Sequence, residues 1–260
     1  MMSFGSPNSV RLRPLSRVKN AVLRGGRRSL AVLMAAALGL GLLTARRNED
    51  YRSALAIWSD TALHRPESWR AQSLLGAALA EDPSRLPEAI SHYEEALRLK
   101  PDYPEAHNDL ANALAKIPGR VPEAISHYEE ALRLRPDFAE AHFNLGYTLT
   151  KSPGHPPEAI AQFEEAIRLK PDYAEAHFYV ANALARDPGR VPEAISHYED
   201  ALRINPDSAE AHNNLAVVLA GIPGRMPEAI AHFKEALRIK PDYADARTNL
   251  ENVLGDRGGL

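Results

Sequence analysis

Ten histidines are the side chains of this 260-residue sequence best suited to bind a metal ion or to transfer protons. Eight of them recur at two positions of a 35-residue period. One set is His92, His127, His197 and His232, and the other is His107, His142, His177 and His212. Metal ligands must converge on one point, whereas residues repeated at this interval are spread along an array. We therefore interpret them as repeat-position histidines and predict no metal site.

Adjacent glutamates are the second candidate for chemistry, because two carboxylates can act as acid and base. They recur as Glu94/Glu95, Glu129/Glu130 and Glu164/Glu165, each pair followed by an arginine three to four residues later. That spacing favours ion pairs on a solvated helix face. The sequence also has no cysteine, no phosphate-binding loop and no Ser/His/Asp arrangement. It therefore predicts no enzyme, no catalytic residue and no cofactor.

The segments that carry these residues are repeats of one unit. The sequence PEAISHYEEALRLKPDY begins at Pro87 and returns with few changes at Pro122, Pro157, Pro192 and Pro227. Each unit contains two apolar patterns of helical period, which predicts a helical hairpin with Pro118-Gly119 at the centre of one turn. We expect aspartates to cap the first helices in capping boxes. These are Asp102/Glu105, Asp137/Glu140, Asp172/Glu175 and Asp207/Glu210.

The repeated unit resembles the tetratricopeptide repeat family. The residues that carry the resemblance are Leu110, Ala111, Leu114, Ala124, Tyr128, Ala131 and Pro136, which recur in phase in the other units. The period of 35 is one residue longer than the usual 34. The resemblance implies an all-α, right-handed solenoid of five hairpins plus two half units. We place a half-repeat helix in residues 46–68, the five units in residues 69–243, and a capping helix with a tail in residues 244–260.

The same resemblance implies that the first helices line a concave groove, in an arrangement similar to the asparagine ladder of O-GlcNAc transferases. The predicted groove residues are Asn108, Asn112, Phe143, Asn144, Tyr147, Phe178, Tyr179, Asn182, Asn213, Asn214, Asn249 and Asn252. Asparagine amides both donate and accept hydrogen bonds, so a row of them can hold an extended peptide. We expect the aromatic members to be the hot spot and Phe143, Phe178, Asn144 and Asn182 to be surface-exposed. The alternative is that these polar residues only face solvent.

The amino-terminal region has a different composition. Residues 1–47 contain nine of the 31 Lys and Arg residues and no acid, and the rest of the chain has a net charge of −12. An acidic array would repel phosphates, so no nucleic-acid partner is predicted. Residues 29–45 form an uncharged run that spans about 25 Å as a helix, near the lower limit for crossing a bilayer. We predict a single transmembrane helix there, preceded by a basic tail of residues 1–28.

The distribution of charge predicts the orientation of this helix. Seven basic residues precede it, which favours a cytoplasmic amino terminus and places the repeats in the periplasm or otherwise outside the cytoplasm. A cleaved signal peptide is the competing interpretation. Ala35/Gly39 and Ala37/Gly41 are small residues four apart, a spacing that permits self-association of membrane helices.

The junction after this helix resembles another family. Residues 44–53, together with Ile57, Trp58 and Pro66, are similar to the join between membrane helix and repeats in transmembrane-and-tetratricopeptide proteins of the O-mannosyltransferase-like type. The function favoured by the sequence is a membrane-anchored scaffold that binds an extended peptide or protein partner in its groove. The alternative is an accessory or severed domain of a membrane glycosyltransferase system. A cytoplasmic co-chaperone ranks last, because Glu105, Glu140 and Glu175 oppose its basic clamp.

Overall fold

A computed structural model describes residues 54–151 and 156–255, and it is all-α in these residues. Its twelve α-helices are α2 (Ala54–His64), α3 (Trp69–Ala80), α4 (Leu86–Leu99), α5 (Pro104–Leu114), α6 (Val121–Leu134), α7 (Ala139–Thr150), α8 (Pro156–Leu169), α9 (Ala174–Leu184), α10 (Val191–Ile204), α11 (Ala209–Ala220), α12 (Met226–Ile239) and α13 (Ala244–Gly255). Two 3-10 turns, η1 (Pro83–Arg85) and η2 (Pro188–Arg190), precede α4 and α10.

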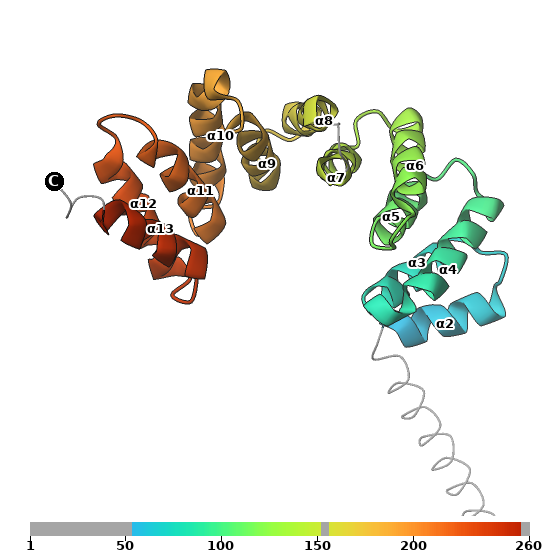
Figure 1. Cartoon of the computed structure of the whole chain (residues 1–260). Helices are drawn as coiled ribbons and strands as arrows, with labels where there is room; N and C mark the ends of the chain where they lie inside the picture. Colours follow the sequence, from blue (N-terminus) through green and yellow to red (C-terminus); the bar gives the residue numbers. More distant parts are fainter. Residues whose placement is uncertain (1–53, 152–155, 256–260) are drawn as a thin grey trace, which may run out of the picture. The chain divides into compact units, whose positions relative to one another are not determined.

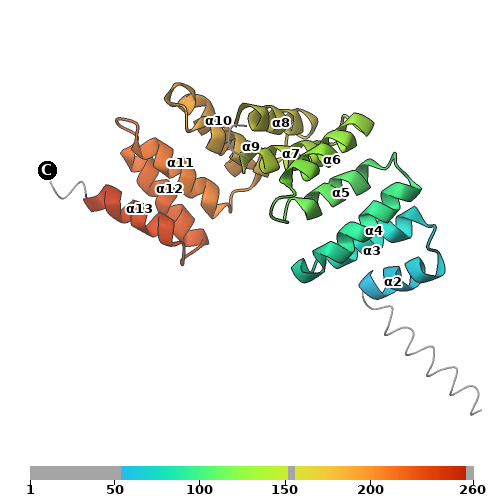
Figure 2. The same cartoon turned by 45° about the vertical axis from the view of Figure 1, so that its right-hand side comes forward.

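The helices from α3 onward pack as successive hairpins (Figure 1). Each first helix packs on the second helix of its own repeat, as α3 does on α4 and α11 on α12. Each second helix also contacts the next first helix, as α6 does with α7, and Figure 2 shows this order along the chain. The contacts between residues divide the chain into two compact parts, with the boundary between Asp60 and Thr61. The repeats described below belong to the part that begins at Thr61.

The predicted transmembrane helix in residues 29–45 lies outside the described residues, as does the basic tail. Among the helices that are described, none is both long enough and apolar enough to cross a membrane.

The core of each hairpin is built from small residues and one large ring. Ala124, Ala131 and Tyr128 of α6 are at most 1% exposed, as are Leu110 and Ala111 of α5. Full burial of a large apolar side chain contributes about 1.5–3 kcal/mol to the stability of the fold. Helices of this length are barely stable alone in water, so they depend on such tertiary packing. The core positions predicted from the repeat are confirmed.

Gly146 shows how closely the two helices of one hairpin approach. A Cβ atom added to Gly146 of α7 would lie 2.9 Å from Cε1 of Phe163 and 3.1 Å from the Ala159 carbonyl oxygen of α8. Real Cβ contacts are longer than this, so the phenylalanine ring occupies the space of the missing methyl group. The small residue at this repeat position is therefore a packing requirement.

Two different turns connect the helices of the hairpins. Between α5 and α6, Gly119 has a φ of 83° and Arg120 N–H donates to the Ile117 carbonyl at 3.1 Å. This is a type II turn with proline and glycine in its centre, as predicted. Before α10, the Asp187 carboxylate instead accepts from Gly189 N–H at 2.9 Å, and the turn becomes a 3-10 helix. The residue before proline therefore selects the turn.

The predicted capping boxes are wrong. The N-cap of α5 is Tyr103, that of α7 is Phe138 and that of α9 is Tyr173, and none of the three makes a side-chain capping bond. Each helix begins one residue later than the aspartate pattern indicates, so the aspartate lies outside the cap position. Only serines cap first helices in the described residues, as Ser208 does by accepting from Ala211 N–H at 3.2 Å.

Candidate functional site

An aromatic cluster joins α7, α8 and α9. The ring of Tyr147 lies 5.2 Å from that of Tyr179 and 6.4 Å from that of Phe143, measured between ring centroids. Phe143 and Tyr179 also contact each other at 5.8 Å. These separations are typical of favourable ring pairs. The structure therefore brings together three of the four aromatic residues predicted for the groove.

Two members of the cluster were missed by the sequence analysis. Phe163 is fully buried beneath it, stacked at 5.6 Å on Tyr179, and Tyr173 lies 4.9 Å from Phe143. Phe163 occupies the core position of its repeat, so the sequence pattern indicated only a packing role and not its contact with Tyr179. Tyr173 lies 35 residues after Phe138, at the same cap position of the repeat. This recurrence of an aromatic residue could have identified it as a candidate.

Phe178 does not join the surface formed by its three predicted partners. Its ring packs at 6.2 Å against the buried Tyr198 of α10 and at 5.3 Å against Tyr179. It is half-buried at the edge of the core cluster that its own hairpin of α9 and α10 shares with α11 and α12. The expectation that Phe143 and Phe178 are surface-exposed is wrong, because both rings are partly covered by other rings.

The asparagines bond to one another between repeats. Nδ2 of Asn144 donates to Oδ1 of Asn108 at 3.0 Å, and Nδ2 of Asn249 donates to Oδ1 of Asn213 at 3.1 Å. Asn108 and Asn213 are only 6% and 5% exposed, and Asn144 is half-buried. The expected exposure of Asn144 is therefore also wrong, because its amide bridges two successive first helices.

Core tyrosines orient two further amides. The Tyr128 hydroxyl donates to Asn112 Oδ1 at 2.6 Å, and the Tyr198 hydroxyl donates to Asn182 Oδ1 at 2.6 Å. Asn182 Oδ1 also accepts from Asn214 Nδ2 at 2.8 Å. Within the described residues, Nδ2 of Asn112 and Nδ2 of Asn182 donate no hydrogen bond, so both remain available to a ligand.

Asn252 differs from the other predicted groove residues. It lies in the last helix, α13, and is exposed.

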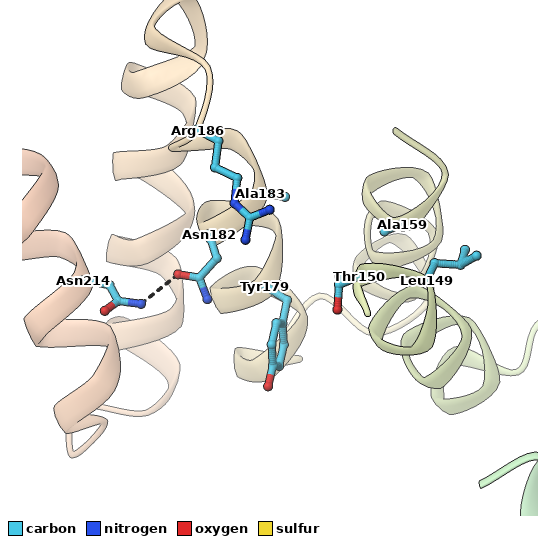
Figure 3. A pocket seen from close by; sticks show the side chains of 8 residues that line it. All are labelled: Leu149, Thr150, Ala159, Tyr179, Asn182, Ala183, Arg186 and Asn214. Carbon is cyan, nitrogen blue, oxygen red and sulfur yellow. Dashed lines mark hydrogen bonds between the residues drawn. The ribbon is translucent and has the colours of Figure 1, made fainter. Parts of the chain in front are cut away.

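Two pockets meet at Tyr179. The larger has a volume of about 570 Å³ and is lined by Phe143, Tyr147, Asn112, Lys116 and Lys151, among others. The smaller has a volume of about 370 Å³ and shares Tyr179 with the larger one. Figure 3 shows its lining, with Tyr179 and Asn182 on α9, Arg186 just after the end of α9, and Thr150 on α7. Aromatic walls with a few oriented polar groups are typical of ligand sites.

Cations and carboxylates are both present around these pockets. Lys151 Nζ lies 4.2 Å from the centroid of the Tyr147 ring, a cation-π contact. Lys116 and Lys151 outnumber Glu175 in the lining of the larger pocket, and Arg186 lines the smaller one. Burial raises the pKa of Tyr179, and the neighbouring Tyr147 adds to the effect, so its hydroxyl stays protonated at neutral pH. Both pockets therefore favour an anionic ligand group.

Asp109, one helical turn before Asn112, is an acidic group in an unfavourable environment. Burial raises its pKa to about 6, a hydrogen bond from Asn108 lowers it, and the charges of Glu105 and Glu140 raise it further. Glu105 itself forms an ion pair of 2.8 Å with Arg135.

In three of the described hairpins, two histidines meet across the two helices. Nδ1 of His107 lies 3.0 Å from Nδ1 of His127, and the same contact joins His177 with His197 and His212 with His232. The sequence analysis treated the two histidine series separately and did not predict these contacts between them. Residues 20 positions apart in the chain lie opposite each other on the two antiparallel helices of one repeat.

Comparisons with known proteins agree with this architecture. The family described as "Tetratricopeptide repeat" matches residues 154–204 and 184–244, and the family described as "TPR repeat" matches residues 84–117 and 118–152. No curated protein matches the chain.

Several solved structures are similar in fold. YrrB, described as a TPR protein with an unusual peptide-binding site, is 23% identical with a TM-score of 0.59, covering 74% of this chain and 96% of YrrB. MamA is 26% identical with a TM-score of 0.55, covering 62% of this chain and 92% of MamA. TTC0263, a thermophilic TPR protein of Thermus thermophilus, is 24% identical with a TM-score of 0.53, covering 72% of this chain and 99% of TTC0263.

The repeated core residues, the helical hairpins that they form and the family matches along residues 84–244 show that this chain belongs to the tetratricopeptide repeat family.

Proposed function

We propose that this protein is a scaffold that binds an extended peptide or a protein segment at the two pockets that share Tyr179 in their linings. The observation that carries the proposal is that aromatic walls and oriented amides of α5, α7 and α9 line these pockets together with cations that lie just after the ends of the same helices. The Nδ2 groups of Asn112 and Asn182 are donors to a peptide carbonyl, and the rings accept an apolar side chain.

The charges define the ligand further. Because Lys116, Lys151 and Arg186 exceed the one carboxylate of the lining, the preferred segment carries an aspartate or glutamate next to an aromatic or large apolar residue. The same arrangement disfavours a basic peptide. YrrB is described as having a peptide-binding site, and its similarity of fold is compatible with this proposal.

The test is a binding titration of the full-length chain with fluorescent extended peptides that combine one aromatic residue with two acidic residues. Tyr147→Ala removes a pocket wall and Lys151→Ala removes a cation, so both should weaken binding at least about tenfold. Val217→Ala is the matched control, since Val217 occupies the same repeat position as Tyr147 two units later and is 50% exposed. Equal affinity for the parent and all three variants would refute the proposed site.

We also propose that residues 29–45 anchor the chain in a membrane, with residues 1–28 in the cytoplasm and the repeats outside it. The support is the uncharged run and the excess of basic residues before it. Fractionation of cells and protease treatment from the extracytoplasmic side test this. Digestion of the repeats in a membrane-bound chain is expected. A soluble, fully protected chain would contradict the anchor, and loss of residues 1–45 would show cleavage instead.

A further inference from the structure

The His177–His197 pair differs from an ordinary hydrogen-bonded pair in what surrounds it. His177 lies on α9 and His197 on α10, with the two Nδ1 atoms 3.0 Å apart. Nε2 of His177 lies 3.2 Å from the carbonyl oxygen of Pro171. A carbonyl only accepts, so Nε2 must carry the proton of this imidazole. The Nδ1 atom of neutral His177 therefore presents a lone pair toward His197.

A carboxylate completes this group. Oδ2 of Asp200, one turn after His197 on α10, lies 3.9 Å from Nδ1 of His177. One ligand atom from each of the three residues falls within 4.8 Å of the others. The His177 side chain is 8% exposed, so its ring is held in this position by packing as well as by Pro171.

We propose that Nδ1 of His177, Nδ1 of His197 and Oδ2 of Asp200 bind a divalent transition-metal ion such as Zn²⁺. Two imidazoles, one carboxylate and an open fourth position form a typical donor set for zinc. Zn–N bonds of about 2.0–2.1 Å in tetrahedral geometry place the two nitrogens about 3.3 Å apart, so the rings must separate by only a few tenths of an ångström.

The proton between the rings defines what must change on binding. With His177 accepting, the proton lies on Nδ1 of His197 in the metal-free protein. Metal binding requires His197 to adopt its other neutral tautomer, with the proton on Nε2 and a lone pair on Nδ1. The hydrogen bond from Nε2 of His177 to the Pro171 carbonyl has the same form as the outer contacts that orient metal-binding histidines.

The other two histidine pairs lack a carboxylate in this arrangement. Glu130, beside His107 and His127, is held through both oxygens by Arg133 at 2.7 Å. Glu235, beside His212 and His232, is also bound through both oxygens by Arg238, at 2.8 to 3.0 Å.

Asp200 has a shorter side chain than these glutamates, and Arg203 binds its Oδ1 at 2.8 Å. Its Oδ2 is the oxygen that lies toward His177. We therefore predict that only one of the three histidine pairs forms a metal site.

The test is calorimetric titration of ZnCl₂ into the full-length chain, purified without a histidine tag, and absorption spectroscopy with CoCl₂ in its place. The decisive variant is His197→Gln. It recreates the native pair of His142 and Gln162, whose Nδ1 to Oε1 distance is 2.7 Å, so the hairpin retains its contact while a ligand is lost. The matched control is His232→Gln, which makes the same change in a pair without an oriented carboxylate.

We expect one Zn²⁺ per chain, a Co²⁺ spectrum of a four-coordinate site, and a rise in the unfolding temperature with zinc. Removing an outer contact of a metal site commonly costs 10–100-fold in affinity, so losing a ligand in His197→Gln or Asp200→Asn should weaken zinc binding at least about tenfold. His232→Gln should change it less than about twofold. Unchanged zinc affinity in His197→Gln would overturn the site, and equal losses in His197→Gln and His232→Gln would overturn the role of Asp200.

Circular dichroism of the metal-free variants distinguishes loss of a ligand from loss of the fold. The His197→Gln and His232→Gln proteins should match the parent in helical content and in unfolding temperature without metal. If His197→Gln does not fold, Asp200→Asn still decides, because Asp200 is 37% exposed and contributes no core packing.

Discussion

Nδ2 of Asn144 donates a hydrogen bond of 3.0 Å to Oδ1 of Asn108, and this contact connects helices α7 and α5 of successive repeats. Asn108 is almost fully buried and in turn donates to Asp109 at 3.3 Å. An asparagine expected to serve a ligand thus also supports the stacking of the repeats. Substitutions in this surface must therefore be tested for stability and for binding separately.

The Asn144→Ala substitution should lower the free energy of unfolding. It leaves Oδ1 of the buried Asn108 without its donor, and an unsatisfied buried polar group costs about 1–3 kcal/mol. Asn252→Ala is the control, because Asn252 is exposed in the last helix and its loss should cost less than about 0.5 kcal/mol. Urea denaturation measures both. Equal midpoints would show that the bridge between α5 and α7 contributes nothing.

The Gly146→Ala substitution should destabilise the hairpin of α7 and α8. The new methyl group would lie 2.9 Å from the Phe163 ring, and overpacking of this kind costs about 1–3 kcal/mol. Gly221→Ala is the control, since the nearest atom to its added Cβ is 3.5 Å away. Thermal unfolding followed by circular dichroism distinguishes them. A similar small shift for both would mean that Phe163 can move aside without cost.

The two turn types predict opposite tolerance to alanine in the same Pro-Gly-Arg sequence. Gly119 has a φ of 83°, a conformation that costs an alanine about 1–2 kcal/mol. Gly189 has no positive φ, so Gly189→Ala should be nearly neutral. Chemical denaturation of the two variants gives the comparison. Greater damage from Gly189→Ala would contradict the assignment of the turns.

The paired histidines should make the fold sensitive to acid. Burial lowers the pKa of His127, His197 and His232 below the ordinary 6.5, and the charge of the facing histidine lowers it further. The unfolded chain then binds more protons than the folded chain. The free energy of unfolding is therefore fully retained above pH 6.5 and decreases as the pH falls from 6.5 to the lowered values. Denaturation at a series of pH values measures this.

His127→Gln provides the internal comparison, because α8 already has glutamine at this position, Gln162. It should reduce the loss of stability between pH 6.5 and acid. An unchanged pH profile in this variant would show that the pair of His107 and His127 does not govern the acid sensitivity.

Asp109 should act in the opposite direction. Its pKa of about 6 in the folded protein exceeds the ordinary 3.8, because burial and the charges of Glu105 and Glu140 disfavour the carboxylate. The folded chain therefore binds the extra proton, and Asp109 lowers stability above pH 6 but not near pH 4. Asp109→Asn should raise the unfolding temperature at pH 8 more than at pH 4. A larger gain at pH 4 would contradict the raised pKa.

The sequence was sufficient to predict the hairpins and their cores. Leu110, Ala111 and Tyr128 recur with the period of the unit, and burial of small and aromatic residues follows from that pattern in every repeat. The turn at Gly119 was also readable, because proline followed by glycine suits one backbone geometry. These features depend on residues close in sequence or on an identical neighbouring unit.

The partners of the polar side chains were decided only by the tertiary structure. Spacing places His177 and Asn144 on a helix face, but the crossing and register of the packed helices determine that His177 meets His197 and that Asn144 meets Asn108. Phe143 and Phe178 occupy the same repeat position, and each packs against the buried ring of its own hairpin. Phe143 also stacks with Tyr147 and lines the larger pocket, whereas Asn182 at the equivalent position of α9 offers Phe178 no such ring. Directional contacts depend on differences of a few ångströms between elements, and a periodic sequence pattern does not encode them.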